Sequence, residues 1–254
     1  YMLEVKNVSK TFTSGLIRKK KIQAVKNVSF SLESGRTLGI MGNSGCGKTT
    51  LSRIILHLIE PDEGQIFINE KRVSGFGKKM EKKDHRKVQM VFQHPGSALD
   101  PSKKIQYSLM EPMEIQKLFS EEERRERIEK LLKLTGISPN LLKRYPHEIS
   151  GGEAQRLVIC RSLVLEPQIL ILDEPTSMLD VSVQASILNL LKELQKELDL
   201  SYLFISHDLD VLSWFSDDIA VMKQGEFLEI GKKDSVLLRP QKEYTKQLIQ
   251  AFSH

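Results

Sequence analysis

The feature that most constrains the fold is a glycine-rich segment, here called the glycine loop, Gly42-Asn43-Ser44-Gly45-Cys46-Gly47-Lys48-Thr49, which fits the pattern G-x-x-x-x-G-K-[ST]. Residues 37–41 before it predict a short buried strand, and residues 50–56 after it predict a helix. The glycines let backbone N–H groups form a nest for phosphate oxygens, at the positive end of the helix. In this pattern the Lys48 ammonium is expected to bind the β- and γ-phosphates, and the Thr49 hydroxyl is expected to be a ligand of Mg²⁺. The segment therefore predicts a phosphate-binding strand–loop–helix unit rather than a glycine-rich turn that carries a lysine.

Length and composition favour an ordinary water-soluble protein. The chain has 254 residues, of which 28% are charged and 40% hydrophobic, as in one compact domain or two tightly joined lobes. No apolar run has the length needed to cross a bilayer, and residues 1–4 show no signal-peptide pattern. We therefore expect a cytosolic protein that serves a membrane, if at all, as a peripheral partner.

Two basic runs, at residues 18–21 and 78–87, stand out against a net charge of only +5. They can contact nucleic acid or acidic lipid head groups, but solvated loop tips are the favoured interpretation. Few aromatic residues lie among these basic residues, which argues against binding to nucleic acid. Cys46 and Cys160 are the only cysteines, so neither a disulfide framework nor a metal cluster is expected. Cys46 is interpreted as a small filler of the loop, with a reactive thiol as the less favoured alternative.

Alternating apolar and polar residues predict an antiparallel β layer beside the glycine loop. We expect strands at 3–8, 24–32 and 65–68, a turn at 11–15 and an exposed loop at 71–87. Phe12 lies at the end of the first strand. It is equally well interpreted as a core residue of the strand end and as a stacking plate for a purine ring.

Helical periodicity replaces the alternation from about His94 to His147. Ser120 and Glu123 fit a capping box, apolar residues from Ile128 onward form one stripe, and Gly136 ends the helix. Farther on, the apolar runs 168–172 and 202–205 are typical of central strands covered on both faces. Helices between the runs, a hairpin at 219–230 and a helical tail at 240–252 predict a mostly parallel α/β sheet.

The acidic pair Asp173-Glu174 follows the first of these apolar runs and precedes Pro175. A carboxylate at a strand end can hold Mg²⁺, directly or through water, opposite Thr49. Because Mg²⁺ needs only one carboxylate, Glu174 is then free to polarise water as a general base. The alternative is a helix N-cap followed by a first-turn acid. The preceding apolar run and Pro175 favour the catalytic interpretation.

Gln93 and His207 each follow a predicted strand. Ligands of open α/β sheets gather outside the carboxyl ends of the strands, so both side chains can reach a γ-phosphate. Gln93 can orient the attacking water or complete the Mg²⁺ shell. His207 can hydrogen-bond the γ-phosphate, although a lone histidine is more often structural.

Residues 149–156, Ile-Ser-Gly-Gly-Glu-Ala-Gln-Arg, resemble the signature segment of ABC transporter ATPases. The glycine loop, Gln93, residues 169–174, residues 177–180 and His207 match that family in order over nearly the whole chain. The resemblance implies an α/β P-loop NTPase fold with a RecA-like core of mostly parallel sheet, an antiparallel β subdomain and a helical subdomain. The core is then expected at 1–93 and 156–254, and the helical subdomain at about 94–155.

The resemblance also implies a head-to-tail dimer in which two subunits enclose two molecules of ATP with Mg²⁺. Phe12 matches the adenine-stacking aromatic, and residues Gly42 to Thr49 together with Thr50 are expected on the phosphates. The partner's ATP is expected on the signature residues Ser150, Gly151, Gly152 and Glu153, with Asp180 crossing the interface. The implied catalytic residues are Glu174, His207, Gln93 and Lys48, and the implied Mg²⁺ ligands are Thr49, Gln93 and Asp173.

Two residues depart from the family pattern. Glu153 replaces a glutamine at the end of the signature, which suits a helix N-terminus but adds negative charge near the partner's ATP. Met178 replaces a small residue, and we expect that change to be tolerated.

Within this family, four short segments resemble the peptide and nickel importer branch: residues 91–95, 99–101, 144–148 and 243–246. The chain to His254 lacks the cysteine-bearing tail of many members, which favours the nickel or metal-chelate group. This implies an ATPase at the cytoplasmic face of the membrane that drives uptake of nickel, a metal chelate or a di- or oligopeptide. Its expected partners are permease subunits docking near Gln93, a non-identical second ATPase subunit and, indirectly, a solute-binding protein.

Three other functions are weighed against this one. A nucleic-acid or ribosome ATPase of the same superfamily is the main alternative, but residues 47–150 carry no sustained heptads and the chain holds one such domain. A module that traps ATP without turnover conflicts with Glu174 and His207. An exporter half would be fused to a membrane span. We therefore expect no nucleic-acid partner.

Overall fold

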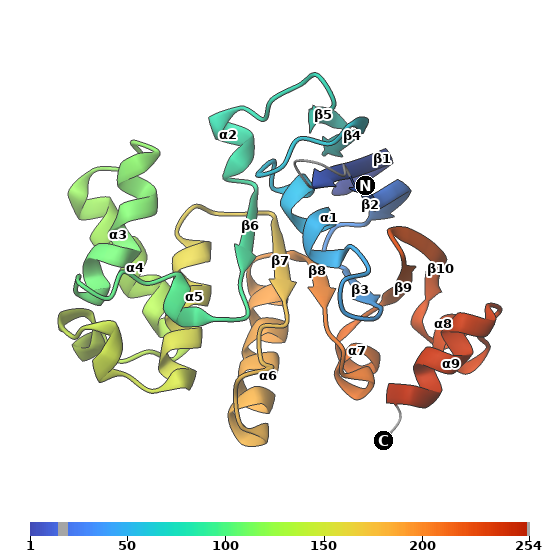
Figure 1. Ribbon diagram of the computed structural model, residues 1–254. Coiled ribbons are helices and arrows are strands. Elements are labelled where there is room, and N and C mark those ends of the chain that lie inside the picture. Colours follow the sequence, from blue (N-terminus) through green and yellow to red (C-terminus); the bar gives the residue numbers. More distant parts are fainter. Residues whose placement is uncertain (15–19, 253–254) are drawn as a thin grey trace. The chain divides into compact units, whose positions relative to one another are not determined.

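The computed structural model describes residues 1–14 and 20–252 (Figure 1). Contacts divide the chain into two compact units: unit 1 holds residues 1–85 and those after 200, and unit 2 holds residues 86–200. Among the described residues no helix combines the length and apolar character that a bilayer span requires. The expected helical subdomain at about 94–155 falls within unit 2, and its boundaries stay a prediction.

Unit 1 contains an antiparallel sheet of order β2-β1-β4-β5, formed by β1 Leu3–Ser14, β2 Lys20–Leu32, β4 Glu63–Ile68 and β5 Lys71–Gly75. Strand β1 lies between its neighbours, with Leu3 opposite both Leu32 and Ile68. These three side chains are buried, as the alternating pattern predicted. The predicted β layer is therefore confirmed.

Two sequence expectations for this sheet are wrong. The expected turn at 11–15 is absent over residues 11–14, because Thr11 and Phe12 pair with Gln23 and Ile22 and extend β1 to Ser14; Gly15 lies outside the described residues. The expected exposed loop at 71–87 contains β5 and the short helix α2 Lys82–His85. The basic side chains of this segment are typical of a loop, so the sequence did not predict β5, whose register is set by its pairing with β4.

A second group of unit 1 strands is centred on β3 Thr37–Met41, which runs parallel to β8 Ser201–Ile205 and to β9 Asp218–Lys223. All residues of β3 and β8 are buried, as expected for strands covered on both faces. The predicted hairpin is confirmed, because β10 Glu226–Lys232 runs antiparallel to β9.

The helices of unit 1 flank these strands. They are α1 Lys48–Ile55, α7 Leu209–Phe215, α8 Lys233–Leu238 and α9 Glu243–Phe252. Figure 1 shows α8 and α9, in red, beside β10. The helical tail was predicted, whereas α7 and α8 were not.

Unit 2 contains the parallel pair β6 Val88–Val91 and β7 Ile169–Asp173. Its helices are α3 Ile105–Ile115, α4 Glu121–Thr135, α5 Gly151–Leu163 and α6 Val181–Glu197, with 3-10 turns at 95–97, 139–143 and 146–148. The predicted capping box of Ser120 and Glu123 opens α4, and Gly136 ends it with a φ of +66°. The predicted fold class, parallel strands with helices plus a separate antiparallel sheet, is thereby confirmed.

Candidate functional site

The glycine loop joins β3 to α1 in unit 1 and packs tightly against its neighbours. Gly47 has a φ of +114°, and a Cβ there would lie 2.2 Å from the carbonyl oxygen of Ala24 on β2. Only glycine fits such a position. Gly47 is also the N-cap of α1, and among the described residues no side chain caps that helix. A helix start without a side-chain cap is the arrangement expected where a helix N-terminus binds an anion.

Lys48 folds back over the loop that precedes it. Its Nζ donates to the carbonyl oxygens of Gly42, at 2.6 Å, and Asn43, at 3.1 Å, and lies 3.7 Å from the Sγ of Cys46. The ammonium group is thus held where phosphate oxygens would meet the loop. Thr49 is exposed and Thr50 half-buried at the start of α1.

The structure adds loop contacts that the sequence analysis missed. The N–H of Gly225, in the turn between β9 and β10, donates to the carbonyl of Cys46 at 2.8 Å. From α9, the hydroxyl oxygen of Tyr244 accepts a hydrogen bond from the backbone N–H of Asn43. Burial raises the pKa of Tyr244 despite that bond, and Lys223 Nζ lies 4.4 Å from the ring centroid. No local sequence pattern predicts these contacts, because they depend on the pairing of the β9–β10 hairpin and on the packing of α9.

Phe12 and His207 also belong to unit 1. The Phe12 side chain is 39% exposed on β1, with Lys10 Nζ 5.8 Å from its ring centroid. This exposure does not fit the interpretation as a core residue, whereas stacking on a purine stays a prediction. His207 is exposed directly after β8 and its role also stays a prediction.

In unit 2 the carboxyl ends of β6 and β7 bring Gln93 and Glu174 together. Gln93 Nε2 donates to Glu174 Oε2 at 3.2 Å and to Ser177 Oγ at 3.1 Å. The next helix, α6, begins only at Val181 with Asp180 as its N-cap, so the acidic pair is not an N-cap followed by a first-turn acid, and that alternative is wrong. Glu174 has a φ of +48°, a strained conformation for a side-chain-bearing residue.

Oxygen ligands for Mg²⁺ are present in both units but are few. Asp173, half-buried, is the last residue of β7, and the Gln93 carbonyl and the Thr49 hydroxyl are further oxygen donors. Among the described residues no group of three or more His, Cys, Asp or Glu side chains could cage a metal ion. Mg²⁺ is usually held by one or two carboxylates together with substrate phosphates, and in unit 2 Asp173 offers one carboxylate at a strand end, so its role as a Mg²⁺ ligand stays a prediction.

The signature segment opens α5 with a complete capping box. Ser150 is the N-cap: its N–H and its hydroxyl donate to Glu153 Oε2 at 2.8 and 2.9 Å, and its Oγ accepts from the Glu153 N–H at 3.3 Å. The hydrogen bonds from Ser150 hold the pKa of Glu153 below its ordinary value. The Glu153 carboxylate is thus engaged within its own helix end.

The starts of α5 and α6 pack together closely. A Cβ at Gly152 would lie 2.8 Å from Val183 Cγ1, and one at Gly151 would lie 3.5 Å from Leu179 Cδ2. Asp180 caps α6 by accepting from the Val183 N–H at 3.0 Å. The signature glycines and Asp180 are therefore part of one local structure.

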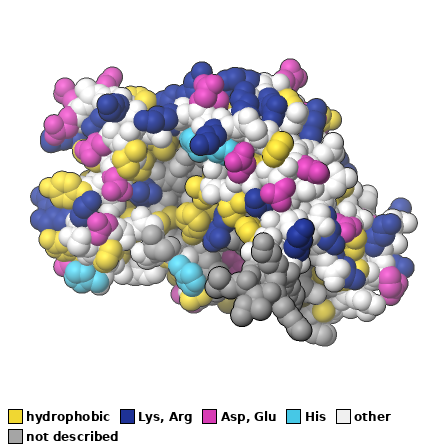
Figure 2. Space-filling view, turned by 45° about the horizontal axis from the view of Figure 1, so that its top comes forward, with side chains coloured by type: hydrophobic (Ala, Val, Ile, Leu, Met, Phe, Trp, Pro, Cys, Tyr) yellow, Lys and Arg dark blue, Asp and Glu magenta, His cyan; other side chains and the backbone are white. Residues whose placement is uncertain are grey.

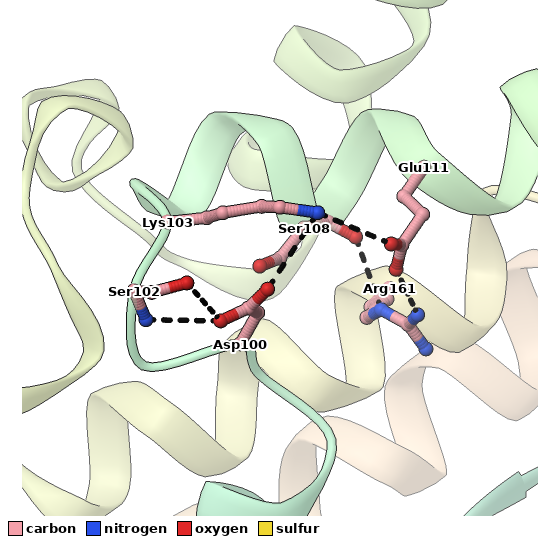
Figure 3. Close-up of polar contacts among 6 residues, drawn as sticks. All are labelled: Asp100, Ser102, Lys103, Ser108, Glu111 and Arg161. Carbon is pink, nitrogen blue, oxygen red and sulfur yellow. Dashed lines mark hydrogen bonds and ion pairs between the residues drawn. The ribbon is translucent and has the colours of Figure 1, made fainter.

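A polar network fixes the other half of α5 against α3 (Figure 3). Arg161 on α5 donates to Glu111 Oε2 at 2.9 Å and to the Ser108 carbonyl at 3.0 Å. Lys103 lies 3.8 Å from Glu111 and 3.5 Å from Asp100, whose pKa is lowered chiefly by hydrogen bonds from Ser102. The network stabilises the orientation of the signature helix within unit 2.

The chain thus carries two glycine-containing loops, a glutamine near a strand end and an acidic pair, the features from which the sequence predicts a nucleotide site. Comparison with known proteins accounts for them. The sequence profile described as "ABC transporter" matches residues 25–177. The chain is 44% identical over 255 residues to the oligopeptide transport ATP-binding protein AppF of Bacillus subtilis (strain 168), covering 98% of this chain and 78% of the relative. The chain belongs to the ABC transporter family.

Other members of the ABC transporter family agree with this assignment. The di/tripeptide transport ATP-binding protein DppF of Pseudomonas aeruginosa (strain UCBPP-PA14) is 42% identical, over 91% of this chain and 72% of the relative. A dimeric ATP-binding cassette, solved in a post-hydrolysis state with ADP and Pi, superposes with a TM-score of 0.78 at 32% identity, covering 91% of this chain and 99% of that one. This ABC domain is an ATPase, and its predicted cofactor ATP is confirmed.

Proposed function

We propose that this ABC ATPase is the ATP-binding subunit of an importer for di- or oligopeptides and drives uptake through a separate membrane permease. The observation that carries the cargo class is the match to peptide-transport ATP-binding proteins over nearly the whole chain. Nickel or a metal chelate, also expected from the sequence, is the competing cargo.

Hydrolysis is assigned to the residues at the strand ends of unit 2. Glu174 acts as the general base, and Gln93, bonded to it at 3.2 Å, orients the attacking water. Asp173 and Thr49 would supply oxygen ligands to Mg²⁺, and the ion would offset the negative charge that develops on the phosphates. Lys48 neutralises the β- and γ-phosphates, and His207 hydrogen-bonds the γ-phosphate. Phe12 stacks on the adenine ring.

The chain works as half of a head-to-tail pair with a non-identical ATPase subunit. Support comes from the dimeric form of a similar cassette and from the signature helix, whose N-terminus is an anion-binding element. The pair acts at the cytoplasmic face of the membrane, where permease subunits dock near Gln93 and a solute-binding protein delivers cargo from the other side. Nucleic acid is not a partner.

The substitution Glu174→Gln tests the chemical step. It keeps the size and hydrogen-bonding reach of the side chain but removes the base, so phosphate release should fall about 10²-fold or more while a fluorescent ATP analogue still binds. Full activity in this variant would overturn the assignment of Glu174.

Uptake by whole cells tests the cargo. Cells that lack the chromosomal copy and carry the wild-type chain should accumulate a labelled dipeptide, and cells carrying Glu174→Gln should not. Labelled nickel accumulating in place of the dipeptide would transfer the assignment to the metal-chelate group. An ATPase rate that rises with added RNA or DNA would favour the nucleic-acid alternative.

A further inference from the structure

The charge of this chain is concentrated in one segment. Residues 71–87 contain eight Lys or Arg and two Asp or Glu, a net charge of +6, whereas the whole chain carries +5. All other residues together therefore carry −1. A charge distributed in this way produces a local field that a nearly neutral remainder does not cancel.

The part of this segment in unit 1 forms a surface with few free acids. The basic surface is defined here as Lys71, Arg72, Lys78, Lys79, Lys82 and Lys83. Asp84 is buried and pairs with Lys71 at 3.4 Å, and Glu81 pairs with Lys83 at 2.7 Å. Both acids are thus occupied, and residues 71–85 still hold a net charge of +4.

An exposed aromatic side chain lies on a rigid turn beside the basic surface. Phe76 is 59% exposed and stands between Gly75 and Gly77, whose φ angles are +126° and +70°. The Phe76 N–H donates to the Gly64 carbonyl at 2.9 Å, and the Lys78 N–H donates to the Gly75 carbonyl at 3.0 Å. The backbone bonds hold the turn in place, so Phe76 is presented without the entropy cost of ordering a loop.

Hydrogen bonds link the turn to its basic neighbours. Arg72 donates to the Phe76 carbonyl at 2.7 Å, and Lys78 Nζ donates to the Arg72 carbonyl at 2.8 Å. Figure 2 shows Lys and Arg side chains, in dark blue, gathered over the side of unit 1 that carries β5 and α2 in Figure 1. A single exposed apolar residue is ordinary, but an aromatic fixed among cations is the combination that binds membrane interfaces.

We propose that the basic surface and Phe76 bind the anionic head groups of a lipid bilayer directly, with Phe76 entering the interface between head groups and acyl chains. Nucleic acid fits this surface less well, because one aromatic on a tight turn offers no series of stacking platforms for bases. The inference goes beyond the proposed function. There the permease recruits the chain, whereas here the chain has its own affinity for the membrane in which the permease lies.

Sedimentation with vesicles that contain no protein tests this inference independently of any permease. The purified chain should bind vesicles of phosphatidylcholine in which roughly one lipid in three is the anionic phosphatidylglycerol, and should not bind vesicles of pure phosphatidylcholine. Each basic side chain near such a surface contributes roughly a fivefold gain in partitioning. The triple variant Lys79→Gln, Lys82→Gln, Lys83→Gln should therefore lower the partition coefficient about 100-fold, and Phe76→Ser should lower it further.

A matched control separates the basic surface from net charge. Lys130→Gln, Lys133→Gln, Lys196→Gln removes the same charge at exposed positions of α4 and α6 and should leave vesicle binding near the wild-type level. Both triple variants should keep the wild-type ATPase rate, which shows that they fold. Equal losses in the two triple variants, equal binding to neutral vesicles, or RNA binding that exceeds vesicle binding at the same salt concentration would each overturn the proposal.

Discussion

Two helices of this chain begin at a glycine-containing loop, and they differ in whether a side chain caps the N-terminus. At α1 the N-cap is Gly47, which has no side chain to offer as an acceptor. At α5 the N-cap is Ser150, and Glu153 closes a capping box with it. Both ends carry the positive pole of a helix, but only the start of α5 is closed by its own side chains.

The difference indicates how the two loops handle a phosphate. The glycine loop of unit 1 is held by close backbone contacts, such as the 2.2 Å that would separate a Cβ at Gly47 from the Ala24 oxygen. It is therefore preorganised to hold the nucleotide of its own chain. At α5 the Ser150 hydroxyl already donates to the Glu153 carboxylate, so an anion has to compete for it; under the proposed function that anion is the phosphate of a second subunit's ATP.

The largest effect is expected from Gly47→Ala, which gives the glycine loop a side chain. The new Cβ would overlap the Ala24 oxygen and force a φ of +114° on alanine, so the loop must shift. We expect ATP affinity, measured by titration with a fluorescent analogue, to fall about 10- to 100-fold. Gly45→Ala is the matched control: its φ of +75° also disfavours a side chain, but its Cβ meets nothing within 4 Å, so equal losses in the two variants would refute the packing argument.

At the signature, Gly152→Ala is expected to slow turnover without weakening ATP binding. Its Cβ would lie 2.8 Å from Val183 Cγ1, so the starts of α5 and α6 must separate. Phosphate release by the assembled transporter should fall about tenfold, the cost of a displaced contact of this kind. Adding Val183→Ala makes room for the methyl group and should restore most of the rate; failure of that rescue would show that the glycine serves another purpose.

Glu153→Gln makes the two loops more alike. It should raise the rate of phosphate release, by less than Gly152→Ala lowers it. A neutral amide holds the Ser150 hydroxyl less strongly than a carboxylate does, so phosphate competes better. We expect the rate of phosphate release by the assembled transporter to rise about two- to fivefold, while the ATP dissociation constant of the isolated chain stays unchanged. A rate at or below the wild-type level would contradict the competition.

The capping box of α4 provides the control for this variant. Glu123→Gln weakens a capping box of the same geometry, formed with Ser120. It should lower the melting temperature about as much as Glu153→Gln does, but it should not change the ATPase rate. Hydrogen bonds from the capping serines lower the pKa of both carboxylates from 4.5. The stability lost in each variant is therefore present above pH 4.5 and vanishes as pH falls through the lowered pKa.

An effect as small as that of Glu153→Gln is expected from Tyr244→Phe, which removes the hydroxyl that accepts from the Asn43 N–H in the glycine loop. Other contacts, such as the bond from Gly225 to the Cys46 carbonyl, still hold the loop. We expect a two- to fivefold loss of ATP affinity by the same titration, the net worth of one hydrogen bond. An unchanged affinity would show that the hairpin alone positions the loop.

Much of the fold could be predicted because its central strands are apolar runs with clear ends. Residues 37–41 and 169–173 are strands at or next to the expected positions, and each delivers its functional loop at the carboxyl end. The sequence did not predict β5, because Lys71 and Arg72 are typical of a loop. The segment is nevertheless a strand, since it pairs with β4. Local patterns do not carry such pairing information.

For the candidate site, the limits lie in contacts between distant segments. The spacing of Ser150 and Glu153 repeats that of Ser120 and Glu123, so the signature capping box had a readable signal that the sequence analysis did not use. The contact of Gln93 with Glu174 needs the parallel pairing of β6 and β7. The contact of Tyr244 with Asn43 needs the docking of α9, which follows from no motif.

The most direct test of the contrast between the two loops is calorimetric titration of Mg-ATP into the isolated chain, its Lys48→Ala variant and its Ser150→Ala variant. Removing the Lys48 ammonium should weaken binding about 10- to 100-fold, the worth of a charged hydrogen-bonding group. Removing the Ser150 hydroxyl should change the dissociation constant less than about twofold, because under the proposed function α5 contacts the nucleotide of the partner subunit. Equal losses in the two variants, or wild-type binding by Lys48→Ala, would contradict this account.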